Sequence, residues 1–80
     1  MTTADVVRER ALALARSRVD AHEAVHELEI CCGGGREVAV RARRQLVALL
    51  DSEPDQRDAM LAMGFLDQLI DPAARLDPGR

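Results

Sequence analysis

The stretch Asp20-Ala-His-Glu-Ala-Val-His-Glu-Leu-Glu-Ile-Cys-Cys-Gly-Gly-Gly35 decides the fold, because it joins a long amphipathic segment to two shorter ones. Its three consecutive glycines are the strongest helix stop in the chain. Glycine adopts the left-handed conformation at a helix C-terminus without steric cost, and it weakens any helix that continues through it. We therefore expect the first helix to end just before these glycines and the chain to turn there.

The segment before the glycines has the pattern of one long helix. No Gly or Pro interrupts residues 4–31, and apolar side chains recur at alternating spacings of four and three. This stripe, with one polar member, consists of Val7, Ala11, Leu14, Arg18, Ala21, Val25, Leu28 and Cys32. A second stripe beside it consists of Leu12, Ala15, Val19, His22 and His26. The pattern predicts a helix over about 4–31 with a length of roughly 40 Å, whose two apolar lines both need partners.

Two shorter helices are expected after the glycines. Apolar spacing predicts one over about 36–50. Ser52 is a suitable N-cap for another over about 54–70, with Pro54 in its first turn. No segment shows the alternation of a strand. The predicted fold class is therefore all-α: a three-helix chain with a Gly turn after the long helix, forming a small helical bundle.

The length of the chain limits how much core it can build alone. Its 80 residues make one domain, which we assign to residues 1–72, with residues 73–80 as a C-terminal tail. A chain of this size buries only about 60% of its unfolded surface, and Phe65 is its only aromatic residue. Neither short helix can cover the long one, so we expect a second chain to complete the bundle.

The charge and hydropathy of the chain exclude several classes of protein. The formal net charge is −3, so no overall basic field attracts nucleic acid or an acidic membrane surface. No apolar run approaches the roughly 18 residues that span a bilayer, and the N-terminus lacks the pattern of a signal peptide. We therefore expect a cytoplasmic protein without a membrane partner.

The two cysteines, Cys31 and Cys32, are adjacent in the sequence. Their Cα atoms are about 3.8 Å apart across a trans peptide, which is shorter than the usual disulfide span. We expect two free thiols, with at least one packed in the core as a small hydrophobic side chain.

One basic cluster could contact phosphates. It consists of Arg41, Arg43 and Arg44. The acidic balance of the chain, the lack of interleaved aromatic residues and the absence of helix-turn-helix spacing all argue against nucleic-acid binding. The alternative that we favour is a face that is solvated or pairs with a protein partner.

His22-Glu23-Ala24-Val25-His26 matches the H-E-x-x-H string of zinc proteases. On a helix, His22 and His26 lie one turn apart, and Glu29 lies on the same side as a third possible ligand. Those proteases bind substrate along a sheet edge, and no strand is expected here, so we do not predict peptidase activity or a cofactor. A zinc or iron site in a helical bundle centred on His22 and His26 stays open as the alternative.

The sequence therefore predicts a small non-enzymatic helical interaction protein. It would act as a homodimer or as an accessory or regulatory subunit of a larger complex. The predicted contact surface is apolar and partly Met-rich, which suits adaptable partner binding. Its residues are Leu12, Val19, His22, Met60, Met63, Phe65, Leu66 and Leu69.

Overall fold

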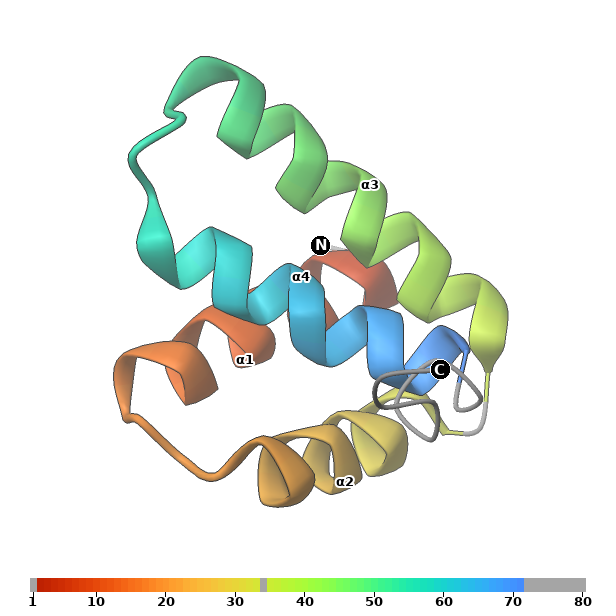
Figure 1. The fold of residues 1–80 in the computed structure, drawn as a ribbon. Helices are drawn as coiled ribbons and strands as arrows, with labels where there is room; N and C mark the ends of the chain where they lie inside the picture. The colour runs from red at the N-terminus through yellow and green to blue at the C-terminus, as the bar shows by residue number, and fades with distance from the viewer. Residues whose placement is uncertain (1, 34, 72–80) are drawn as a thin grey trace, which may run out of the picture.

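The computed structural model describes residues 2–33 and 35–71, and within them the chain forms four helices and no strand (Figure 1). The helices are α1 (Thr3–Arg16), α2 (Ala21–Cys32), α3 (Arg36–Ser52) and α4 (Arg57–Ile70). The all-helical prediction is confirmed, whereas the prediction of three helices is wrong. The predicted tail, residues 73–80, and the predicted domain end at residue 72 lie outside the described residues.

The helix predicted over 4–31 is divided into α1 and α2, because the chain leaves helical geometry after Arg16. Arg18 has a φ of 56°, in the left-handed region. Its N–H donates to the carbonyl of Ala15 at 3.3 Å, and the N–H of Val19 donates to that of Leu14 at 3.4 Å. These two bonds are the 5→2 and 6→1 bonds of a Schellman motif, which ends a helix by satisfying its last carbonyls.

A new helix begins directly after this motif. The Asp20 carboxylate accepts a hydrogen bond from the backbone N–H of His22 at 3.1 Å, so Asp20 is the N-cap of α2. At the other end, Gly33 has a φ of 62° and its N–H donates to the carbonyl of Ile30 at 3.0 Å. The predicted glycine stop is therefore confirmed at Gly33.

The turn between α3 and α4 differs from its prediction. Ser52 is the last residue of α3 and does not cap the next helix. The N–H of Gln56 donates to the carbonyl of Glu53 at 3.1 Å, which closes a turn with Pro54 as its second residue. Proline also keeps the preceding residue out of helical geometry, and Glu53 has φ −133° and ψ 80°. Helix α4 therefore begins at Arg57, three residues later than predicted.

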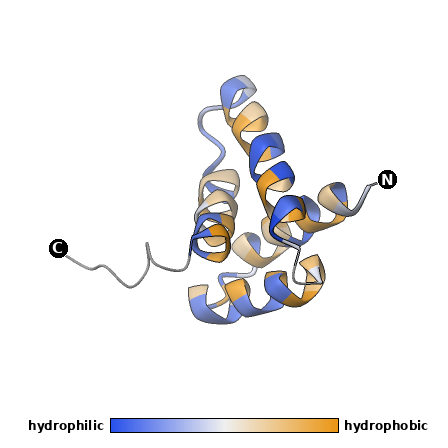
Figure 2. Cartoon of the chain, turned by 90° about the vertical axis from the view of Figure 1, so that its right-hand side faces the viewer, coloured by the Kyte–Doolittle hydropathy of each residue, from blue (hydrophilic) through white to orange (hydrophobic). Residues whose placement is uncertain are grey.

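The core is a single cluster of buried side chains to which every helix contributes. The four largest fully buried side chains come one from each helix: Val7, Leu28, Leu46 and Leu66. Six alanines are fully or almost fully shielded around them and let the helices approach closely: Ala11, Ala24, Ala39, Ala42, Ala59 and Ala62. Apolar and polar faces alternate along the helices in Figure 2. No polar or charged side chain is buried in the described part of the chain.

Helix α4 is the central element. It packs against α1, α2 and α3, and Figure 1 shows it between α3 and α2, with α1 crossing behind it. Because α1 and α2 fold back around α4, no 40 Å helix is left uncovered within the chain. The length mismatch that led us to expect a second chain is therefore absent. None of the four helices combines the length and the apolarity that crossing a bilayer requires.

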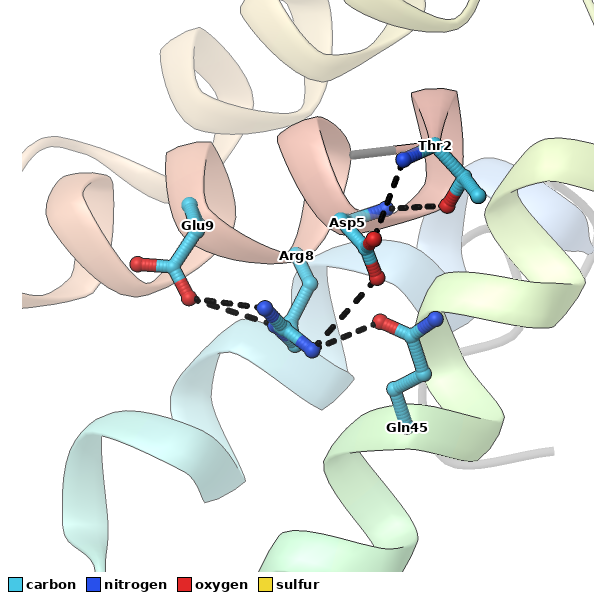
Figure 3. Close-up of polar contacts among 5 residues, drawn as sticks. All are labelled: Thr2, Asp5, Arg8, Glu9 and Gln45. Carbon is cyan, nitrogen blue, oxygen red and sulfur yellow. Dashed lines mark hydrogen bonds and ion pairs between the residues drawn. The ribbon is translucent and has the colours of Figure 1, made fainter.

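Polar side chains connect the helices at the surface. A capping box joins the Thr2 and Asp5 side chains to each other's backbone N–H groups at the start of α1 (Figure 3). One turn later, the Arg8 guanidinium contacts Asp5 and Glu9 and donates to Gln45 on α3 at 2.9 Å. Arg43 of α3 pairs with Asp67 of α4. These contacts link α1 and α4 to α3 at the edge of the core.

Candidate functional site

The ionisable side chains of the H-E-x-x-H string lie on the outer surface of α2, whereas Ala24 and Val25 face the core. The side chains of His22, Glu23, His26 and Glu29 are all exposed there. Within residues 2–33 and 35–71, no three His, Cys, Asp or Glu side chains lie close enough together to hold a metal ion. The fold thus brings no ligand from another helix to the two histidines.

The predicted basic cluster is split by the fold. Arg43 is half-buried and paired with Asp67 of α4, so its guanidinium is already engaged within the chain. Arg41 and Arg44 are exposed and, with Arg36, Glu37 and Val40, line a shallow depression on the outside of α3. Only part of the cluster is therefore available to a ligand.

The structure separates the predicted contact residues into three groups. Leu12, Phe65 and Leu66 are buried in the core. Val19, Met63 and Leu69 are half-buried and pack against that core. His22 and Met60 are exposed, and 54% of the Met60 surface is accessible. A partner can reach the exposed group directly, whereas the buried group already has partners within the chain.

Three further exposed apolar side chains were missed by the sequence prediction, among them Val6 on α1, which is 44% exposed. Leu61 is 52% exposed beside Met60 on α4, and Ile30 is 67% exposed near the end of α2. Leu61 was not distinguishable from its neighbours, because nearly every face of α4 is apolar in the sequence. Ile30 lies outside both predicted apolar stripes. This placement already indicated that its side chain faces away from the core.

An open groove of about 570 Å³ lies where α1 ends, the α1–α2 loop begins and α4 starts. Its lining residues are Ala15, Arg16, Arg18, Val19, Ala21, Arg57, Asp58, Leu61 and Phe65. The groove thus has apolar side chains, with Leu61 accessible, and three arginines against one aspartate. Its residues are far apart in the sequence, so no sequence motif could reveal it.

The charges in the groove are only partly compensated. The Arg16 guanidinium donates to the Asp58 carboxylate at 3.1 Å. Neither Arg18 nor Arg57 forms an ion pair with a residue that the structure describes. Asp20 is nearby in the chain, but its carboxylate accepts the His22 N–H at the start of α2. The groove therefore carries an excess of positive charge on an acidic protein.

The thiols differ in their surroundings. Both are free, with Cys31 half-buried and Cys32 buried in the core. Burial raises the pKa of the Cys32 thiol above its ordinary value of 9.0, and the neighbouring Cys31 adds to the effect. Cys32 is therefore protonated at neutral pH and is a packing side chain, not a nucleophile.

Comparison of the chain with protein-family models, with curated proteins and with solved structures gave no match. The fold and the groove nevertheless define a class: a small all-helical domain with an open, positively charged groove that has an exposed apolar rim. Such a groove can hold a segment with carboxylates and an aliphatic side chain.

Proposed function

We propose that the chain is a non-enzymatic helical interaction protein of the cytoplasm, acting as a homodimer or as an accessory subunit of a larger complex. The observation that carries this proposal is the exposure of Leu61, which lines the groove and is next in the sequence to the exposed Met60. A large apolar side chain left in water forgoes about 1.5–3 kcal/mol of burial. Adjacent exposed apolar residues beside a groove are typical of surfaces that a partner covers.

The chemistry of the groove supports binding more than catalysis. Its ionisable members are Arg16, Arg18, Arg57 and Asp58. Arginine remains charged at any ordinary pH, so it pairs with carboxylates but does not transfer protons. Asp58 is occupied by Arg16. Two guanidinium groups near an apolar rim are suited to orienting an acidic segment of another protein.

The proposal is tested by placing a charge on the rim of the groove. Leu61→Glu is the informative variant, and Ala48→Glu, at an exposed position on α3, is the matched control. We expect the wild-type chain either to form a defined oligomer in light scattering or to retain one partner in affinity purification from its native host. Leu61→Glu should weaken that association about tenfold or more, while Ala48→Glu should not.

Thermal melts of both variants establish that they are folded. A wild-type chain that stays monomeric at every concentration and retains no partner would overturn the proposal. An association that survives Leu61→Glu unchanged would show that the groove is not the contact surface.

A further inference from the structure

We propose that the groove of one copy of this chain binds the outer face of α2 of a second copy. This inference rests on the proposed function and narrows it to self-association through two named surfaces. The groove surface consists of Arg18, Arg57 and Leu61, and the α2 surface consists of Glu23, Glu27 and Ile30.

The α2 surface is complementary to the groove in charge and in apolar character. Glu23, Glu27 and Ile30 are spaced i, i+4 and i+7, so they lie along one line of the helix, and all three are exposed. Ile30 is the most exposed large apolar side chain in the described part of the chain, at 67%. The line therefore offers two carboxylates followed by one aliphatic side chain.

The carboxylates of α2 have no partner within their own helix. Ala21–Cys32 contains three glutamates and no arginine. None of the three forms an ion pair with a described residue, just as Arg18 and Arg57 in the groove form none. The two surfaces therefore carry charges of opposite sign that no ion pair within the described part of the chain engages.

Both surfaces belong to this chain, which favours a second copy over an unrelated protein. Ala21 lines the groove and is also the first residue of α2, so the groove lies at the N-terminal end of the helix whose outer face carries the α2 surface. When both halves of a contact are on one chain, a twofold axis can form the contact twice and leave neither surface free. Ile30 of each copy would then cover Leu61 of the other, with Glu27 close to Arg57.

A charge-exchange experiment tests this arrangement. Arg57→Glu and Glu27→Arg are prepared separately, and each protein is measured alone and in a one-to-one mixture by sedimentation velocity over a range of concentrations. In each homodimer both contacts would place like charges together. In the mixed dimer one contact has the exchanged pair and the other has the native pair. We expect the wild type to dimerise, each variant alone to bind about tenfold or more weakly, and the mixture to recover dimers near the wild-type affinity.

Arg41→Glu and Glu37→Arg are the matched controls, because they make the same charge changes at exposed positions on α3. Neither should alter the dimer. Ile30→Asp is a further variant that removes the aliphatic contact without touching the core, and it should abolish dimers. Its circular dichroism spectrum should still be that of the folded wild type, whereas its melting temperature should no longer rise with protein concentration. Raising the salt concentration should weaken the wild-type dimer, since exposed charge pairs are screened.

A monomeric wild type, or a dimer insensitive to Arg57→Glu, Glu27→Arg and Ile30→Asp, overturns the inference. If the monomer instead retains a different protein and Leu61→Glu releases it, the inference fails while the proposed function stands. If the wild type neither dimerises nor retains any partner, both fail.

Discussion

At the scale of the residue, Arg18 has two separate roles. Its backbone occupies the left-handed region at the end of α1, a conformation that glycine adopts freely and an L-residue adopts at a cost of about 1–2 kcal/mol. Its side chain lines the groove. The conformational cost and the groove charge therefore come from the same position. A glycine there removes both the cost and the charge, whereas an alanine removes only the charge.

Arg18→Gly should make the chain more stable and its self-association weaker. The gain should be about 1 kcal/mol, which raises the melting temperature of a domain this size by about 4–8 °C. Arg18→Ala is the control, because it removes the same charge while keeping the unfavourable backbone. Paired melts and sedimentation runs on the three proteins provide the comparison, and equal melting temperatures for the Gly and Ala variants would contradict the explanation.

The raised pKa of the Cys32 thiol predicts how the stability of the fold changes at alkaline pH. Its pKa is raised in the folded chain, so its contribution to stability is complete below the unfolded value near 9.0 and is lost as pH rises through the folded pKa. The chain has no Tyr and no Lys, so few other groups titrate in this range. Melting temperatures between about pH 8 and pH 11 should fall for the wild type and for Cys31→Ala. If the melting temperature of Cys32→Ala falls by the same amount, a group other than Cys32 causes the pH dependence.

At the scale of the element, the sequence predicted what glycine and apolar spacing determine. The stop at Gly33 and the helix Arg36–Ser52 lie within two residues of their predicted positions. The break after Arg16 was missed because its Schellman motif uses Arg18 where glycine is usual. A signal was present, since Asp20 followed by Glu23 is the start of a typical helix N-terminus. The groove depends on how α1 meets α4, and no local pattern contains that information.

The start of α4 lacks a side-chain cap. Its N-cap, Gln56, makes no side-chain capping bond. Gln56→Ser supplies a hydroxyl that can accept an N–H of the first turn, and it should stabilise the chain by about 1 kcal/mol. Gln68→Ser, within α4, is the control and should not stabilise it. Urea unfolding of both variants measures the difference, and a Gln56→Ser chain no more stable than the control would contradict the capping argument.

At the scale of the whole molecule, the chain closes a core without help from a second copy. Val7, Leu28, Leu46 and Leu66 are each fully shielded by the other helices. Self-association through α2 and the groove would join two chains that each have this core. The sequence-based expectation that a second chain completes the bundle stays a prediction.

The single buried cluster also determines how the molecule unfolds. Because the large core side chains belong to one buried cluster and α4 packs against the other three helices, moving α4 away exposes apolar side chains on all of them. Partial opening then loses nearly as much burial as complete opening, while it regains less conformational entropy. Amide protons in the middle of all four helices should consequently exchange through the global unfolding of the chain. Hydrogen exchange, with each rate divided by the intrinsic rate of its amide, should then give one common free energy of opening for all four helices.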